Sequence, residues 1–591
     1  MCGISGIIGR SWEGSQLERM VDALRHRGPD ARSIFISALG DGAPDEMVGL
    51  GHNRLSIIDT TPGGLQPMTC ADGRLRIVFN GEIYNHPELR AALSDYPFRG
   101  RTDTEVILAA WRRWGDAALH RLIGMFAFLI WDRQTGRLIA ARDRFGVKPL
   151  YYHLRADGTL FAASEIKALQ RVGLGATPAP RTWANYLANG TMESGGETFW
   201  EEIHALPAGH TLTWAGGRIE ISKWYDLAAQ TGSAEDLRPE GEVAAEYEAL
   251  LRESVRFRFR SDLPVAINLS GGLDSSLLLA LVDQEAAPDA AIEAFTFVTG
   301  DPNYDELPWV EGMLASSRRR PIVCALSAAD VPVLAHAVQS AADEPFGGLP
   351  TIAYARLFAE AQHRGVRVLL DGQGMDEQWA GYDYYRNEKG QPVIQGSRDP
   401  ATFAAGLLPE FRALANDTAL PDCYPDRLRN LQHRDITQTK LPRALRFNDR
   451  ISMRASTELR EPFLDHRLVE LALRQPAERK IEPRPGGQTK ILLRQIAARL
   501  VPANLALAPK RAVQTPQREW LRGPLRHWAT EMVEAALDFG SGGWFDGPAI
   551  RRQCQKFFDG EGDNSFFLWQ MISAGMILGR KRSASYGKTG H

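Results

Sequence analysis

The stretch INLSGGLDSSLLLALV, residues 267–282, decides the fold of the second half of this 591-residue chain. A short apolar run ends in glycines and serines and then gives way to a leucine-rich run, which predicts a strand, a tight loop and a helix. Small side chains and free N–H groups at a helix start form a ready anion site. No lysine follows in the GKS or GKT manner, so the loop is not a Walker P-loop. Asp274 would repel a phosphate unless Mg²⁺ joined them.

The same alternation of strand and helix continues along the chain. AIEAFTF (291–297) and VRVLL (366–370) read as further strands, and a helical pattern at 351–364 precedes the second of them. Such alternation is typical of a doubly wound α/β domain with a parallel sheet. We expect this domain to span 244–585, with a mainly helical region after residue 400.

The first half has a different pattern. Residues 2–205 contain many short strand-like runs separated by turns, with helical patterns at 83–95 and 104–115. Mixed strands and helices of this kind predict an α+β domain of packed layers. The polar, mixed segment at its end predicts a linker at 206–243.

Composition narrows the classes of function. The net charge of −3 gives no electrostatic reason to expect a nucleic-acid partner, and no segment is long and apolar enough to predict a membrane span. The five cysteines, at positions 2, 70, 324, 423 and 554, are odd in number and lack CxxC spacing. The odd number of cysteines and the lack of CxxC spacing argue against a disulfide framework or a zinc site. The start, MCGISGIIGR, lacks the features of a signal peptide, so a cytoplasmic protein is expected.

Cys2 is a candidate nucleophile because removal of the initiator methionine would expose its α-amine. An amine of pKa about 8 can act as the base for a neighbouring thiol. The alternative is a cysteine that merely occupies position 2. Five further motifs accompany it: RHRGPD (25–30), GHNRLSIIDT (51–60), GGLQPM (63–68), FNGEIYN (79–85) and RTDTEVIL (101–108). Together with CGISG they resemble, in order, the glutaminase domain of class II, N-terminal-nucleophile glutamine amidotransferases.

The resemblance implies an α-β-β-α sandwich and a glutamine site. Asn80 and the Gly81 N–H would form an oxyanion hole, for which glycine permits close approach. Arg54 would grip the α-carboxylate of glutamine through a two-pronged contact, and Glu82 and Asp103 would accept hydrogen bonds from its ammonium group. The remaining expected contacts with glutamine come from the loop Leu55, Ser56, Ile57 and Ile58.

The motif SGGLDSS resembles the pyrophosphate loop of ATP pyrophosphatases, which cleave ATP to AMP and pyrophosphate. With the first domain, it makes the chain similar to the glutamine-dependent asparagine synthetase family. YDELPWV (304–310), RFNDRISMRASTELREPFLDHRL (446–468) and APKRAVQTP (508–516) extend that resemblance. It implies ATP as a substrate, Mg²⁺ held by Asp274 and Asp376, a catalytic Lys510, an internal route for ammonia and a homodimer. The implied ATP-binding residues are Leu269, Ser270, Gly271, Gly272, Asp274, Ser275, Ser276, Phe297, Asp371 and Gly372.

One loop departs from the family pattern SGEGSDExxxGY. The chain reads DGQGMDEQWAGY at 371–382, so Asp371, Gln373 and Met375 stand where the family has serine, glutamate and serine. Glutamine cannot accept a proton at neutral pH. In the family pattern, the glutamate lies by the acyl-adenylate, where its carboxylate could take a proton from ammonia. Either another residue of this chain accepts that proton, with Glu377 or Tyr382 as candidates, or Gln373 and Met375 belong to a rebuilt acceptor pocket.

Four interpretations remain for the function. The family default is conversion of aspartate to asparagine, and the alternative is the same chemistry on a uronic acid or on a peptide or lipopeptide carboxylate. A β-lactam-forming relative is disfavoured because a complete glutaminase site argues for the use of ammonia. A scaffold without activity is disfavoured by the presence of Cys2, Asn80 and Asp274.

Overall fold

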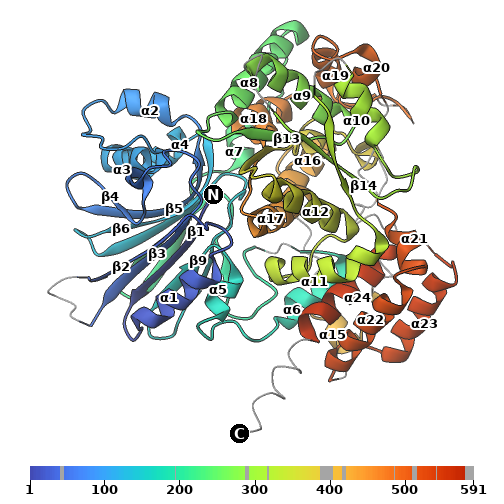
Figure 1. The fold of residues 1–591 in the computed structure, drawn as a ribbon, viewed down its shortest axis with the longest axis horizontal. Coiled ribbons are helices and arrows are strands. Elements are labelled where there is room, and N and C mark those ends of the chain that lie inside the picture. Colours follow the sequence, from blue (N-terminus) through green and yellow to red (C-terminus); the bar gives the residue numbers. More distant parts are fainter. Residues whose placement is uncertain are drawn as a thin grey trace.

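Two six-stranded sheets and one five-stranded sheet organise the chain (Figure 1). The computed structural model describes residues 1–39, 45–192, 195–286, 292–315, 319–386, 404–415, 421–482, 484, 486–508, 515–540, 542–562 and 564–579. The first sheet has the order β10 (His204–Ala205), β8 (Tyr151–Leu154), β9 (Leu160–Ala163), β1 (Gly3–Gly9), β3 (Met47–Arg54), β2 (Ala31–Ala38). The second has the order β12 (Arg218–Lys223), β11 (His210–Ala215), β7 (Arg137–Arg142), β6 (Gly124–Asp132), β5 (Leu75–Ile83), β4 (Met68–Thr69).

These two sheets pack face to face and form a sandwich covered by helices. Ile4 and Leu50 of the first sheet lie in one apolar cluster with Val78 and Leu129 of the second. Helices α1 (Gly14–Ala23) and α5 (Ile166–Gln170) cover the outer face of the first sheet. Helices α2 (His86–Ala92), α3 (Asp103–Trp114) and α4 (Ala118–Arg121) cover the second. The layers are therefore α-β-β-α, as the sequence predicted.

The third sheet is entirely parallel, with the order β15 (Pro321–Ala325), β14 (Ala294–Val298), β13 (Val265–Asn268), β16 (Val368–Leu370), β17 (Glu458–Arg460). In chain order this is 3-2-1-4-5, so the winding reverses between β13 and β16. Helices α11 (Val331–Ala342), α12 (Leu349–His363) and α17 (Lys440–Arg454) cover one face. Helices α8 (Glu240–Arg258), α9 (Leu273–Glu285), α10 (Leu307–Leu314) and α18 (His466–Leu473) cover the other. This is the predicted doubly wound α/β architecture.

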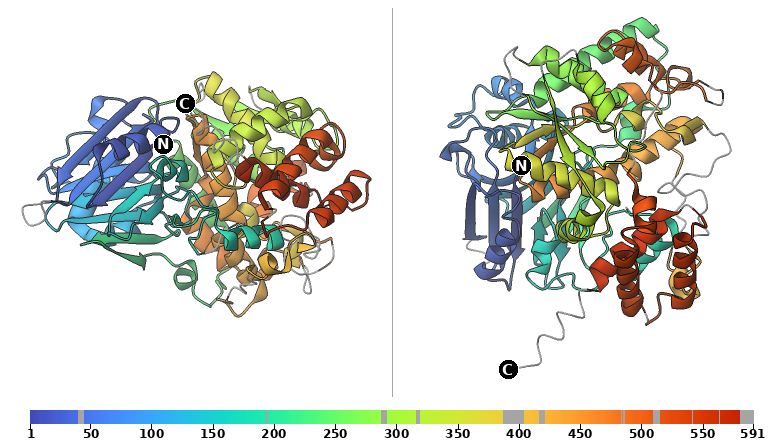
Figure 2. Two further views of the ribbon diagram at one scale, coloured as in Figure 1. Left: turned by 90° about the horizontal axis from the view of Figure 1, so that it is seen from below. Right: turned by 45° about the vertical axis from the view of Figure 1, so that its right-hand side comes forward.

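Helices dominate the region beyond residue 400. They are α15 (Pro409–Arg412), α16 (Arg427–Thr437), α17 and α18, α19 (Ile491–Ala497), α20 (Ala503–Ala506), α21 (Gln517–Arg522), α22 (Arg526–Gly540), α23 (Gly547–Phe558) and α24 (Ser565–Leu578). Helices α6 (Pro180–Asn189) and α13 (Met375–Gln378) lie before this region in the sequence. Both views in Figure 2 keep the sandwich and the parallel sheet side by side, with the red C-terminal helices on the second unit.

The segment 206–243, expected to be a linker, carries regular structure instead. Strands β11 and β12 extend the second sheet, with Thr211 of β11 paired to Ala141 of β7. The short helix α7 (Leu227–Thr231) follows them. Strand pairing satisfies the backbone groups of this polar stretch, which side-chain composition alone does not reveal. We therefore propose that the first domain extends to about residue 225.

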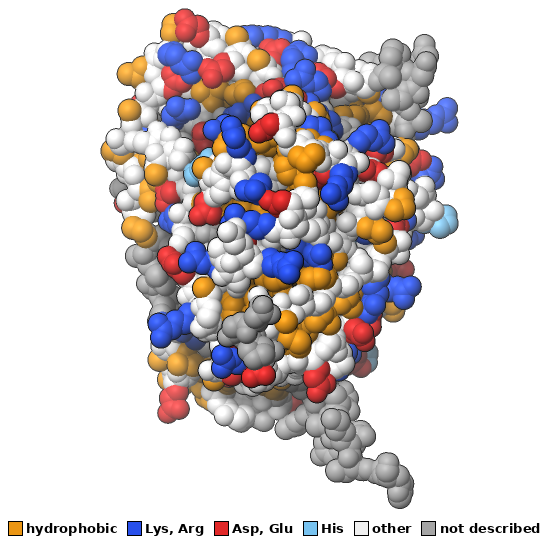
Figure 3. All heavy atoms as spheres, turned by 90° about the vertical axis from the view of Figure 1, so that its left-hand side faces the viewer, with side chains coloured by type: hydrophobic (Ala, Val, Ile, Leu, Met, Phe, Trp, Pro, Cys, Tyr) orange, Lys and Arg blue, Asp and Glu red, His pale blue; other side chains and the backbone are white. Residues whose placement is uncertain are grey.

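The exposed face of the sandwich intersperses acidic and basic side chains (Figure 3). None of the helices in the described parts of the chain has the length and apolar character that crossing a bilayer requires.

Candidate active sites

Cys2 lies immediately before β1 and meets Asn80 of β5, on the opposite sheet. The Cys2 N–H donates to Asn80 Oδ1 at 3.0 Å. The Nδ2 group of Asn80 is fully buried and has no hydrogen-bond partner among the described residues. A buried donor without a partner is costly unless a ligand completes it. Asn80 thus offers an unused N–H donor next to the Cys2 backbone, the kind of group that an oxyanion hole requires.

Gly81 is required by its surroundings. Its φ is +151°, and a Cβ there would lie 2.1 Å from the carbonyl oxygen of Met125 on the neighbouring strand. No other residue fits so close to that backbone. The absent side chain therefore lets β5 pass close to the backbone of β6 immediately after Asn80.

The N-terminal ammonium group of Met1 is buried and lies 2.9 Å from the Oε2 atom of Glu458 on β17. Burial raises the pKa of the Cys2 thiol, while the nearby N-terminal ammonium opposes that rise. Cys2, the candidate nucleophile, thus lies at the junction of the two units, where the N-terminus appears in Figure 1.

Two buried carboxyls, Glu82 and Asp103, lie near the N-terminal ammonium group that precedes Cys2. Burial, followed by Asp103, raises the pKa of Glu82 well above its usual range, and Arg460 at 3.3 Å opposes the rise. Burial raises the pKa of Asp103 to about 6, although its carboxylate accepts the Ile83 N–H. Glu82 Oε1 has no hydrogen-bond partner among the described residues. Such a pair favours a cationic ligand, because an ammonium group would stabilise the ionised carboxylates, which have lost the solvation by water.

Arg54 closes the same region but is bound by its own loop. Its guanidinium donates to the carbonyl of Thr61 at 2.8 Å and to that of Asp59. The segment that follows puts Leu55 and Ile57 in the apolar core and leaves Ser56 and Ile58 half-buried. Contact with a glutamine carboxylate therefore requires Arg54 to share or exchange these carbonyl contacts.

The second candidate site lies where the winding of the parallel sheet reverses. The loops after β13 and β16 meet there: a Cβ on Gly372 would lie 3.6 Å from the Cβ of Asp274. Ligands of doubly wound sheets bind at this position, outside the carboxyl ends of the strands. Two segments that are about a hundred residues apart in the sequence thus form one wall.

The loop after β13 has the small, polar lining expected of an anion site. Ser275 and Ser276 donate to the carbonyl of Gly272, and the Ser270 hydroxyl reaches Ser275. Gly271 has φ +53°, and its Cβ would lie 2.9 Å from the Cβ of Trp309. Leu269 is buried, and its N–H bonds the Phe295 carbonyl at the strand end. Phe297 of β14 is half-buried beside Tyr354, with ring centroids 6.0 Å apart.

Lys490, which the sequence analysis did not single out, joins the two acidic residues of this wall. Its Nζ atom lies 2.6 Å from Asp274 Oδ2 and 2.8 Å from Asp376 Oδ1. Burial lowers the pKa of this lysine, but the two carboxylates reverse the effect and leave its pKa raised. Its φ of +58° is unusual for a side chain of this size. No sequence signal marks this conformation.

Asp274 and Asp376 fit a divalent cation. Both carboxylates reach one ammonium group, so they also lie close enough to share a Mg²⁺ whose other ligands are phosphate oxygens and water. Among the described residues no group of three or more histidine, cysteine or acidic side chains forms a complete metal cage. A two-carboxylate site that a nucleotide completes is the usual arrangement for Mg²⁺.

The rest of the 371–382 loop is distributed between the site and the core. Asp371 is buried and accepts the Gly372 N–H, and the half-buried Gln373 lies 3.5 Å from it. Met375, expected at an acceptor pocket, is instead fully buried against the Tyr247 hydroxyl of α8. The helical turn of α13 directs this side chain inward, whereas Gln373 stays half-buried next to Asp371.

The two expected replacements for the family's glutamate bond each other. The Tyr382 hydroxyl donates to Glu377 Oε1 at 2.7 Å. Burial and the neighbouring Asp376 raise the pKa of Glu377 to about 7. The expected Lys510 lies outside the described residues.

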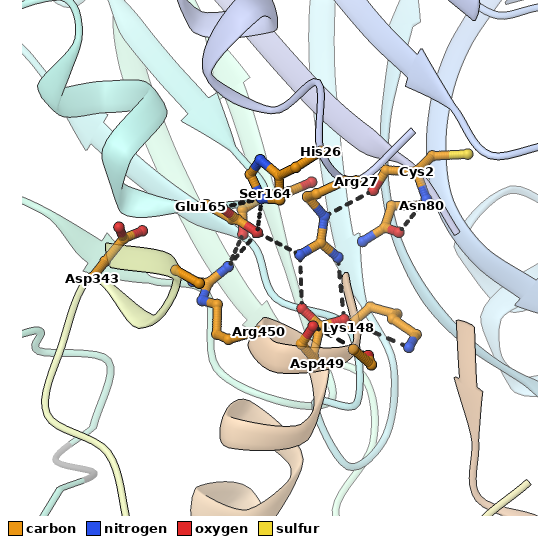
Figure 4. Close-up of polar contacts among 12 residues, drawn as sticks. Cys2, His26, Arg27, Asn80, Lys148, Ser164, Glu165, Asp343, Asp449 and Arg450 are labelled. Atoms are coloured by element: carbon orange, nitrogen blue, oxygen red, sulfur yellow. Dashed lines mark hydrogen bonds and ion pairs between the residues drawn. The ribbon is translucent and has the colours of Figure 1, made fainter. Parts of the chain in front are cut away.

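A buried ion-pair network connects the nucleophile to the second unit (Figure 4). Arg27 donates through Nε to the Cys2 carbonyl at 3.0 Å and through Nη1 to Glu165 at 2.7 Å. Its guanidinium also forms a two-pronged contact with Asp449 of α17 at 2.9 and 3.1 Å. Lys148 lies 3.6 Å from the same carboxylate. Arg27 lies within the RHRGPD motif, but the sequence did not reveal that its partner would come from the other unit.

A cavity lies between the two units. Tyr84, Gly124 and Met125 line it from the sandwich, and Arg258, Glu461 and His466 line it from the second unit. Met125 is the residue whose carbonyl approaches Gly81, so one end of the cavity adjoins the oxyanion-hole strand.

Comparisons with known proteins agree with this division. Residues 1–225 match the family model of a glutamine amidotransferase domain, and residues 246–579 match that of asparagine synthase. The chain is 28% identical to Amidase chyE of Penicillium rubens over 98% of both chains. It is 28% identical to asparagine synthetase [glutamine-hydrolyzing] 1 of Bacillus subtilis over 90% of both. It is 30% identical to a putative asparagine synthetase of Mycobacterium tuberculosis over 94% of this chain and 92% of that one.

Proposed function

Because the chain belongs to the asparagine synthase family, we propose that it adenylates a carboxylate and converts it to an amide with ammonia taken from glutamine. Membership makes it a glutamine-hydrolysing, ATP-using ligase-type enzyme. The proposal concerns the residues that act at each site and the acceptor, which by default is aspartate.

In the first site, Cys2 attacks the side-chain amide of glutamine after removal of Met1 exposes its α-amine as the base. Asn80 Nδ2 and the Gly81 N–H stabilise the oxyanion. Glu82 and Asp103 hold the ammonium group of glutamine, and Arg54 holds its carboxylate. Ammonia leaves, and water hydrolyses the glutamyl thioester to glutamate.

In the second site, the loop 270–276 holds the β- and γ-phosphates of ATP while the acceptor carboxylate attacks the α-phosphate. Asp274 and Asp376 would hold Mg²⁺, which neutralises phosphate charge when bound. Lys490 keeps these two carboxylates together, and its ammonium group could also form an ion pair with a phosphate oxygen of bound ATP. Lys510 is proposed to stabilise charge on the α-phosphate. Ammonia then displaces AMP from the acyl-adenylate after crossing the cavity between the units.

One observation carries this proposal: the loops after β13 and β16 meet at the reversal of the sheet, and the acidic residue of each contacts Lys490. A polyanion with its metal fits such a wall. At the other site, the Nδ2 group of Asn80, which has no partner among the described residues, could stabilise the oxyanion formed when glutamine releases ammonia.

The test is pyrophosphate release from ATP and glutamine across a panel of carboxylates that includes aspartate, uronic acids and acidic peptides. Release with aspartate, together with asparagine in the product, supports the default. Release with another acid and none with aspartate refutes the default but keeps the reaction class. No release with any acid, from protein that hydrolyses glutamine, contradicts the proposed second site.

Gln373 favours the second candidate, which is the same chemistry on an acceptor other than aspartate. At position 373 a neutral amide replaces a carboxylate of the family pattern, while Asp371 replaces a serine, so the loop keeps its number of acids but carries one of them at a different position. The similarity to proteins named Amidase chyE and Amidase chry2 is consistent with a broader set of acceptors in the family.

Two further expectations belong to this proposal. The scattered cysteines fit a reducing, cytoplasmic setting, and all five described cysteines are free. The family resemblance implies a homodimer, which sedimentation of the full chain would test.

A further inference from the structure

Glu461 is a buried carboxyl that the mechanism above does not use. It follows β17 directly, just as Asp371 follows β16, and the two strands are paired so that the Asp371 N–H donates to the Arg460 carbonyl at 3.0 Å. Parallel strands present their carboxyl ends at one edge, so Glu461 stands beside the acyl-adenylate wall. It is 4% exposed.

The carboxyl of Glu461 is only partly satisfied. Its Oε2 atom is buried without a hydrogen-bond partner among the described residues. The N–H of Gln373 and the side chain of Asn448 on α17 face the group. An orphan oxygen on a buried carboxyl indicates a partner that arrives during function.

Glu461 also lines the interdomain cavity, whose other wall includes Met125 beside Gly81. It therefore lies between the end of the ammonia-releasing site and the loop that contains Gln373. Glu377 and Tyr382 have a different position, because they bond each other and Gln432 of α16 holds the Glu377 carbonyl at 2.8 Å.

We propose that Glu461 is the proton acceptor for ammonia attack on the acyl-adenylate, in place of a carboxylate at position 373. The nitrogen lone pair forms the C–N bond to the acyl carbon, and the bond from that carbon to the phosphate oxygen of AMP breaks. AMP leaves with the electron pair, and one N–H proton passes to the Glu461 carboxylate. This inference rests on the proposed function.

The surroundings of Glu461 make its carboxylate a stronger base than an exposed glutamate. Burial, followed by Asp371, raises the pKa of Glu461 well above its usual range, and Lys148 opposes this. A general base is most effective when its pKa approaches the working pH. Because the base must be ionised, amide formation should rise as pH rises through this raised pKa. The other titratable or charged groups that line the cavity are Asp143, Arg144, Arg258, Asp465 and His466, and burial lowers the pKa of His466 to about 3, so this histidine is neutral near pH 7.

The experiment compares E461Q with the unaltered chain, using aspartate or the panel acid that gives the largest pyrophosphate burst. Glutamine keeps the shape of the side chain but cannot accept a proton. Glutamate release and the single-turnover pyrophosphate burst should stay within about twofold, while amide formation falls about 10²- to 10⁴-fold. Hydroxylamine is a stronger nucleophile than ammonia and is neutral near pH 7. It should therefore restore acyl transfer in E461Q, with the hydroxamate as the product.

The matched control is E470Q on α18, whose carboxyl bonds Tyr225 at 2.9 Å outside the cavity. It should behave like the unaltered chain. Amide formation at the unaltered rate in E461Q overturns the inference. Loss of the pyrophosphate burst in E461Q also overturns the inference. So does a result in which E377Q, and not E461Q, keeps the pyrophosphate burst but loses amide formation.

These results separate the two levels of the argument. If the unaltered chain gives no pyrophosphate burst with any acid, the proposed function fails, and the inference with it. If the burst is present and E461Q still forms the amide, only the inference fails.

Discussion

The two candidate sites are built in different ways. Around Cys2, the expected residues all come from the first 103 positions, on or beside strands β1, β3 and β5 of the two stacked sheets and at the start of helix α3. Around Asp274, they come from separate stretches that reach from Leu269 to Lys510, and Lys490, which was not expected, joins two of them. Motifs that are close in sequence identify the first site almost completely, whereas the second depends on which strands become neighbours.

The two sites also handle charge in opposite ways. Glu82 and Asp103 are buried acids whose raised pKa values reflect the lack of a close, fully compensating cation. Asp274 and Asp376 already share the ammonium group of Lys490. The first site is thus prepared for a cationic end of a substrate, and the second holds its own cation for a polyanion. The predictions below test this contrast.

The largest effect is expected for Cys2→Ala. Glutamine-driven synthesis should fall by more than about 10³-fold because the nucleophile is lost. Ammonia-driven synthesis should be unchanged, as measured by pyrophosphate release with ammonium chloride. Loss of both activities in folded protein would contradict two separate sites.

Lys490→Met should have nearly as large an effect at the other site. Without the ammonium group, the Asp274 and Asp376 carboxylates repel each other and the incoming phosphates, so pyrophosphate release should fall roughly 10²- to 10³-fold. Glutamate release in the same sample reports on folding. Lys223→Met, on the exposed strand β12, is the control and should leave both activities unchanged.

The pH dependence of glutamine binding should reveal Asp103. Its pKa of about 6 means that it loses most of its charge between pH 7 and pH 5, so the KM for glutamine should rise about tenfold over that range. Asp103→Asn should have a high KM already at pH 7 and little further pH dependence. An unchanged profile in that variant would show that another group titrates. Asp95→Asn, on the exposed surface, should keep the original profile.

The smallest effect is expected for Asp449→Asn at the network between the sites. Arg27 would keep Glu165 but lose the charge of its partner on α17, so its hold on the Cys2 carbonyl would no longer depend on the second unit. We expect glutamate release per pyrophosphate to rise about fivefold. Glu293→Gln, which removes an exposed ion pair with Arg364, is the control. An unchanged ratio would mean that the network is only structural.

The sequence by itself determined both fold classes, the family and most site candidates. Periodic apolar runs specify strands and helices, and the motifs around Cys2 and Ser270 carry their chemistry within a few residues. It misread 206–243, because strand pairing of β11 and β12 satisfies backbone groups whatever the side chains. It also assigned Met375 to a pocket, whereas a single helical turn directs that side chain into the core.

Only the tertiary structure decided what meets across long sequence separations. Lys490 joins Asp274 and Asp376, Arg27 reaches Asp449, and Glu461 comes to stand beside Asp371 and Gln373. The physical reason is that a parallel sheet collects the ends of strands by their spatial order, and here the order reverses between β13 and β16. Local sequence specifies each strand, but the packing of layers sets that order and, with it, the neighbours of every buried charge.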